Sequence, residues 1–174
     1  MENQTKSSNN IAVNYGVYLG MASVIISLII YAMGKTYEQN WIITLINILT
    51  IVVFVILGIK KFKENNNGYL VLSQGLKTGI AVALIGAIIG IIYILIFVNF
   101  IEPGYTENVL EISRQKMMEN PNLSEEQIDN AIEIQKNFSS PWFIAAVGLL
   151  WSLFIGFITS LIASLVMQQK PELS

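Results

Sequence analysis

The chain has 174 residues and a formal net charge of −2, with 13% charged and 53% apolar residues. So few charges are typical of a protein that is solvated mainly by lipid. Histidine and cysteine are both absent, which excludes disulfides, thiolate nucleophiles, imidazole bases and most zinc, haem or copper sites. We therefore expect no cofactor, no metal and no nucleic-acid partner, and few routes to enzymatic catalysis remain.

Four long segments are predominantly apolar, and each is free of Asp, Glu, Lys and Arg over roughly 20 residues, the length that crosses a bilayer as a helix. A water-soluble helix needs a charged outer face, so the four segments predict an integral membrane protein. The first segment is longer than the core of a cleavable signal peptide, and we retain it as a helix. We predict an all-α, polytopic fold in a single domain, 1–174, with transmembrane helices at about 11–34, 41–59, 73–101 and 140–167.

The connections between the first three apolar segments are short. Residues 35–40 can form only a tight turn, so the first two helices are expected to run antiparallel. Residues 60–68 combine a basic cluster with turn-forming residues and are predicted to be a loop. The polar residues 1–10 are predicted to be a disordered tail.

The sizeable extramembrane segment, 105–139, lies between the third and fourth apolar segments. Residues 107–119 favour a helix, and Ser124 with Gln127 fits the capping box that starts another. We predict a small helical hairpin over one mouth of the bundle. Its docking side would be formed by three apolar residues, Ile128, Ile132 and Phe138.

Lysine and arginine near the membrane ends predict the orientation, because they are retained on the cytoplasmic side. One side of the predicted bundle carries Lys6, Lys60, Lys61, Lys63, Lys77 and Lys170. The other side carries Lys35, Arg114, Lys116 and Lys136, and three of these are spread through the long loop. We therefore expect both termini to be cytoplasmic and the 105–139 loop to lie on the opposite side of the membrane.

Small residues recur at four-residue spacing along three of the predicted helices. In a bilayer, small side chains at positions i and i+4 permit the close approach through which helices associate. Packing within the bundle is the favoured interpretation, and a homodimer face is the alternative. The candidate helix-packing residues are Gly16, Gly20, Gly75, Gly79, Gly86, Gly90, Gly148, Ser152, Gly156 and Ser160.

Basic side chains at the edge of the membrane are candidates for contact with lipid headgroups. Lys60, Lys61, Lys63 and Lys77 could bind an anionic lipid together. The plainer interpretation is that Lys77 extends its ammonium group to the interface and helps to set the topology. The many acids of the long loop, from Glu102 to Glu133, are interpreted as a solvated helix face and as caps.

Two stretches of the sequence resemble a known family. Residues 68–79 (GYLVLSQGLKTG), the glycine-rich helix that follows, and residues 100–105 (FIEPGY) are similar to the uncharacterised-domain family 4199. That family comprises small four-helix membrane proteins, mostly of Bacteroidota, with a long acidic loop before the last helix. The resemblance implies a bacterial inner-membrane protein with this loop in the periplasm. It implies no activity and no catalytic residue.

Three functions are compatible with the sequence. A non-enzymatic structural or interaction protein is favoured, with a membrane-protein partner bound through the small-residue face or the 105–139 loop. A transporter or channel subunit is the first alternative, although every acid lies outside the predicted spans and intramembrane charges usually mark transport paths. A lipid-modifying enzyme is the second alternative, and it would lack the His, Cys or buried carboxylate that such chemistry needs.

Overall fold

The computed structural model describes residues 2–38 and 40–170, with side chains from residue 10 onward. Lys6, whose charge entered the topology prediction, therefore has its side chain outside the described part, as does residue 39 of the α1–α2 turn. The described residues form six α-helices and a short π-helix: α1 (Glu2–Ala32), α2 (Trp41–Asn65), α3 (Leu72–Ile96), η1 (Phe97–Ile101), α4 (Tyr105–Met118), α5 (Glu125–Asn137) and α6 (Pro141–Met167).

Four helical segments are long and apolar enough to cross a membrane. They are Asn10–Ala32, Trp41–Asn65, Leu72–Ile101 and Pro141–Met167. Large apolar side chains cover much of their outer surface, including Leu150, which is 67% exposed. Water would disfavour so large an exposed apolar surface, whereas lipid does not. The prediction of an all-helical protein with four membrane-spanning segments is confirmed at this level.

Two predicted boundaries are wrong. Residues 60–65 were expected in a loop, yet α2 continues to Asn65, because Lys and Glu are good helix formers and no Gly or Pro interrupts them. The helix ends where Asn67 and Gly68 adopt positive φ angles of 53° and 83°. The polar start of the chain is likewise not a free tail, because α1 already begins at Glu2.

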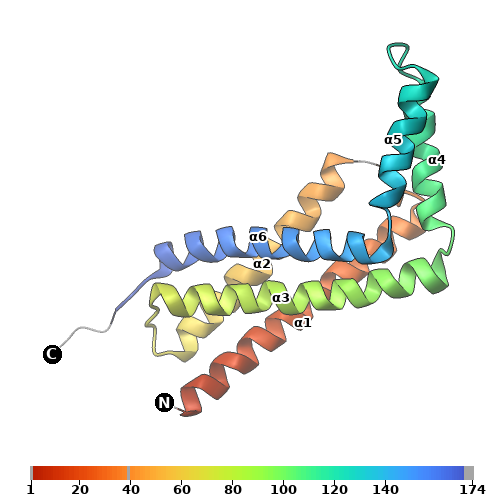
Figure 1. Ribbon diagram of the computed structural model, residues 1–174. Helices are drawn as coiled ribbons and strands as arrows, with labels where there is room; N and C mark the ends of the chain where they lie inside the picture. Colours follow the sequence, from red (N-terminus) through yellow and green to blue (C-terminus); the bar gives the residue numbers. More distant parts are fainter. Residues whose placement is uncertain (1, 39, 171–174) are drawn as a thin grey trace.

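The central element of the bundle is α3, which lies against α1 on one side and α6 on the other (Figure 1). The second helix crosses α3 and α6 in Figure 1, and it contacts all three of the other spanning helices. The start of α1, the α2–α3 turn and the end of α6 gather at one end of the bundle. Helices α4 and α5 stand at the opposite end (Figure 1).

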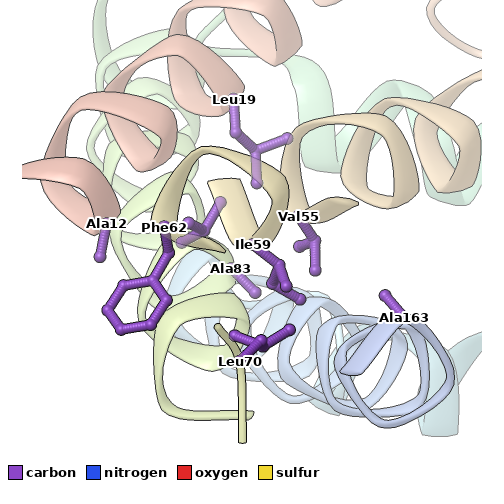
Figure 2. Packing of buried hydrophobic residues seen from close by; sticks show 9 residues of the cluster. Ala12, Leu19, Val55, Ile59, Phe62, Leu70, Ala83 and Ala163 are labelled. Atoms are coloured by element: carbon purple, nitrogen blue, oxygen red, sulfur yellow. The ribbon is translucent and has the colours of Figure 1, made fainter. Parts of the chain in front are cut away.

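The buried apolar core lies toward the end of the bundle that carries the α2–α3 turn. All of the spanning helices contribute to it, with Leu19 from α1, Val55 and Ile59 from α2, Ala83 from α3 and Ala163 from α6 (Figure 2). A single antiparallel bridge closes the same end. It joins Leu70, just before α3, to Gln169, just after α6, through N–H···O bonds of 2.8 and 2.9 Å.

Helices α4 and α5 lie side by side and project away from the bundle (Figure 1). Arg114 on α4 pairs with Asp129 on α5 at 2.7 Å, and Gln135 donates to the Ser113 hydroxyl at 3.0 Å. Ile128 is buried, and because α5 packs mainly against α4, its burial comes from that helix. The prediction that Ile128 docks the hairpin onto the bundle mouth is therefore wrong. Ile128 is thus covered by α4, the neighbouring helix of the pair.

The other two residues of the predicted docking side differ from Ile128. Ile132 is half-buried, and Phe138 is 54% exposed. The Phe138 ring contacts Phe143 at the start of α6, with 5.0 Å between the ring centroids. This aromatic contact lies at the base of the projecting pair, where α5 returns to the bundle.

Candidate functional site

The carboxylate of Glu102 receives hydrogen bonds from distant parts of the chain. The Tyr31 hydroxyl, near the end of α1, donates to Oε2 at 3.0 Å, and the Tyr37 hydroxyl in the α1–α2 turn donates to Oε1 at 3.1 Å. Asn108 on α4 donates to the Tyr37 hydroxyl at 3.0 Å. We call these residues, with Tyr105, the Glu102 cluster. It links α1, the α1–α2 turn and α4 at the end of α3.

The local sequence explains the position of Glu102. At the end of α3 the helix widens into η1, and the Glu102 N–H donates to the Phe97 carbonyl at 2.8 Å. Pro103 has no N–H with which to continue the helix, so the chain turns there toward α4. Single π-turns of this kind are frequent at functional sites.

Aromatic rings surround the cluster. Tyr37 stacks on Tyr105 with 5.6 Å between the ring centroids. Phe97 packs edge-on against Tyr31 at 5.1 Å and against Tyr105 at 5.8 Å. Each such pair contributes about 0.5–1.5 kcal/mol beyond the apolar area it buries. The base of the hairpin is therefore attached to the bundle by rings as well as by hydrogen bonds.

Two tyrosines of the cluster that lie outside the spans, Tyr37 and Tyr105, have a raised pKa. Burial raises the pKa of Tyr37 above its ordinary value of 10.0, the Asn108 hydrogen bond lowers it, and Glu102 raises it. Burial also raises the pKa of Tyr105, and the neighbouring Tyr37 adds to that effect. Both hydroxyls are protonated at neutral pH, so Tyr37 can donate to Glu102. The stability they contribute is present below about pH 10 and is lost as the pH rises beyond it.

Two cavities adjoin the cluster. A cleft of about 440 Å³ lies between the α1–α2 turn and the hairpin, with Tyr37, Glu38, Tyr105 and Lys116 among its lining residues. A smaller cavity of about 170 Å³ reaches toward the spans. Thr36 lines both, and its buried Oγ1 has no hydrogen-bond partner among the described residues. An uncompensated buried hydroxyl favours a polar partner in this space.

Most of the small residues singled out in the sequence lie where two helices approach closely. A side-chain carbon added at Gly16 would come within 2.6 Å of Ile85, at Gly20 within 2.6 Å of Ile89, and at Gly86 within 2.6 Å of Leu19. Ser152 on α6 donates to the Ala83 carbonyl on α3 at 3.3 Å. The same crowding joins α3 to α6 at three further pairs: Gly75 with Ser164, Gly79 with Ser160, and Gly156 with Ala83.

Gly90 and Gly148 differ from the rest. A side-chain carbon added at either would meet nothing within 4 Å in the described part of the chain, so neither permits a close helix approach. Both line a groove of about 240 Å³ together with Leu19 and Ser23 of α1. The helices diverge here, which spacing along the sequence alone cannot reveal. The favoured interpretation, packing within the bundle, is therefore wrong for these two glycines, and a homodimer face stays a prediction for them.

The four candidate lipid-binding lysines do not form one group. Lys60, Lys61 and Lys63 lie on the last turns of α2, and Lys77 is exposed on α3. Lys61 pairs with Glu64 at 3.2 Å, while Lys63 is half-buried. At about 100° per residue, Lys61 points to a different side of α2 from Lys60 and Lys63.

Sequence reasoning missed the Glu102 cluster. Glu102 was counted among the solvated acids of the loop, because its tyrosine partners are 71 and 65 residues away in the sequence. Within the described residues, the acids gather in no group of three that could hold a metal ion. The available signal was the single acid at the end of an apolar helix, followed by Pro-Gly-Tyr.

A bundle of four apolar spans, closely packed through small residues and carrying an extramembrane helix pair, defines a multi-pass helical membrane protein. The family described as "Protein of unknown function (DUF4199)" matches residues 14–169, and the chain belongs to this family. The expected family membership is thus confirmed. Comparisons with curated proteins and with solved structures gave no match.

Proposed function

We propose that this protein is a non-enzymatic inner-membrane protein that presents the α4–α5 hairpin to a protein partner in the periplasm. The observation that supports the proposal is the projection of this helix pair from the bundle (Figure 1). Hydrogen bonds of the Glu102 cluster hold the base of the pair to the bundle. Its outer surface exposes apolar side chains at Met118, Leu123 and Ile134. Apolar groups on an extramembrane surface are typical of an interaction site.

The small-residue rows support the hairpin as the place of contact. Gly75, Gly79 and Gly156 face neighbouring helices of the same chain, so these positions are not free to form a homodimer face. The cleft between the α1–α2 turn and the hairpin offers a partner both charged and apolar contacts, from Glu38, Lys116 and the two stacked tyrosines.

Lysine distribution and family resemblance support the assignment of sides. Lys60, Lys61, Lys63 and Lys77 lie at the end of the bundle that carries the α2–α3 turn, opposite the hairpin. Lysine near short turns is retained in the cytoplasm, which assigns the termini to that side and the hairpin to the periplasm.

A photo-reactive amino acid tests the partner surface in living cells. Placed at Leu123 or Ile134, it should form a covalent adduct with a periplasmic or membrane protein on illumination. Placed at Asn65, at the other end of the bundle, it should not form that adduct. The same adduct from Asn65, or none from either hairpin position, would remove the basis of the proposal.

A further inference from the structure

An apolar groove of about 580 Å³ runs between α2 and α6. Ile48, Val52 and Ile56 line it from α2, and the α6 wall runs from Phe154 to Met167. These α2 residues recur every fourth position and so form one stripe along the helix. No element of the described chain fills the groove, and its walls are almost entirely hydrocarbon.

The groove has the length of one bilayer leaflet. The α6 wall covers 13 residue steps, which is about 20 Å at 1.5 Å per residue, and the α2 wall covers about 12 Å. Half of the bilayer core is about 15 Å thick. Met167 is the last residue of α6, so the groove ends at the membrane surface on the side of the α2–α3 turn.

Two lysines follow the groove along the same face of α2. At about 100° per residue, Lys63 lies about 20° and Lys60 about 40° from the direction of Ile56. Lys61 lies about 140° away, and its ammonium group already pairs with Glu64 at 3.2 Å. Lys60 and Lys63 therefore extend the line of the α2 wall, one and two turns beyond Ile56, and Lys61 does not.

We propose that the α2–α6 groove holds an acyl chain of an anionic phospholipid, whose headgroup phosphate is bound by Lys63 and Lys60. The apolar stripe accounts for the chain, and the two lysines account for the charge. A helix from a second copy is a weaker fit, because the four described spans carry one acid between them, Glu64, and it already pairs with Lys61. The long carbon stem of a lysine allows its ammonium group to reach a headgroup phosphate from the edge of the membrane.

Native mass spectrometry of the full-length protein in mild detergent tests this site with phosphatidylglycerol as the probe. Lys63→Gln and Lys60→Gln should each weaken retention of phosphatidylglycerol about five-fold, as expected for one lysine near a lipid phosphate. Lys61→Gln removes the same charge from the neighbouring position and should leave retention unchanged. Phosphatidylcholine, which has no net charge, should bind the parent as weakly as phosphatidylglycerol binds the variant that combines Lys60→Gln with Lys63→Gln.

A variant that fills the groove tests the contribution of the acyl chain to binding independently of the headgroup charge. Ile162 lines the groove and is 57% exposed, so Ile162→Trp adds bulk without entering the core. It should reduce retention of phosphatidylglycerol at an unchanged melting temperature, whereas Leu150→Trp, on the same helix outside the groove lining, should not. Equal losses from Lys61→Gln and Lys63→Gln, or full retention in Ile162→Trp, would overturn the proposal. So would a dimer, seen in the same spectra, that Ile162→Trp disrupts.

Discussion

At the scale of single residues, close contact between helices depends on glycine, which has no side chain to keep a neighbouring helix away. Gly156 allows α6 to approach Ala83 of α3, and Gly79 allows Ser160 to approach α3. Lipid offers apolar side chains the same environment as a neighbouring helix does, so close contact of backbones supplies the attraction. Two glycines in one row, Gly148 and Gly156, nevertheless have opposite surroundings.

Replacing each of these two glycines by alanine should distinguish the effect of packing on stability from the effect of helix propensity. Gly156→Ala adds a methyl group against Ala83, and we expect a loss of about 1–3 kcal/mol and a lower melting temperature in detergent. Gly148→Ala gains helix propensity in open space and should be neutral or slightly stabilising. Melting temperatures measured for both variants and the parent provide the check. Equal melting temperatures for the two variants would contradict the close approach at Gly156.

A second residue-scale prediction concerns Tyr37. Tyr37→Phe keeps the stacked ring but removes the hydroxyl that joins Glu102 to Asn108, at a cost of about 1 kcal/mol. Amide hydrogen exchange in residues 104–110 should become faster, because the base of α4 loses one attachment. Tyr69→Phe, at the other end of the bundle, serves as the control. Exchange in 104–110 that is equally slow in both variants would show that stacking alone holds the hairpin.

At the scale of elements, the four spans could be predicted from the sequence, but the ends of the helices and the contacts between them could not. A bilayer requires long apolar helices, so four segments without charges specify four spans. The end of a charge-free stretch is not the end of a helix, however, because α2 continues through Lys60 to Asn65. The Glu102 cluster depends on Tyr31 and Tyr37 reaching Glu102 in space, a contact that no local pattern encodes. Tertiary geometry also decides which glycines meet a neighbour.

The α4–α5 pair provides a test at this scale. Each helix is short enough to be marginal in water by itself, so the pair depends on the apolar contact around Ile128 and on the Arg114–Asp129 ion pair. Ile128→Asp combined with Ile132→Asp places charges at a buried and a half-buried position, and we expect the pair to open. Limited proteolysis in spheroplasts should then cleave within 119–139 while the spans remain inserted.

A single change provides the matched control for that experiment. Ile134 lies on the same helix and is 59% exposed, so Ile134→Asp introduces the same charge where water already has access. Its cleavage rate should equal that of the parent. If the double variant resists protease as well as Ile134→Asp does, the apolar contact with α4 is not what orders these helices.

At the scale of the whole molecule, the two ends of the bundle differ in chemistry. One end carries the α2–α3 turn, the Leu70–Gln169 bridge and exposed lysines. The other carries the Glu102 cluster and the projecting hairpin. Close packing of α1, α3 and α6 joins the two ends as one unit. The side of the membrane on which each end lies therefore decides which surface a partner or a lipid can reach.

The chain contains no cysteine, so single cysteines introduced into it report the orientation without a background signal. Asn65 and Asn122 are exposed asparagines at opposite ends of the bundle. Because lysine near short turns is retained in the cytoplasm, Asn122→Cys should react with a membrane-impermeant maleimide in spheroplasts, and Asn65→Cys should react only after the membrane is opened. Labelling of Asn65→Cys in intact spheroplasts would reverse the orientation, and with it the periplasmic exposure of the hairpin. The four spans and the groove between α2 and α6 would remain, but the anionic lipid would then be drawn from the outer leaflet.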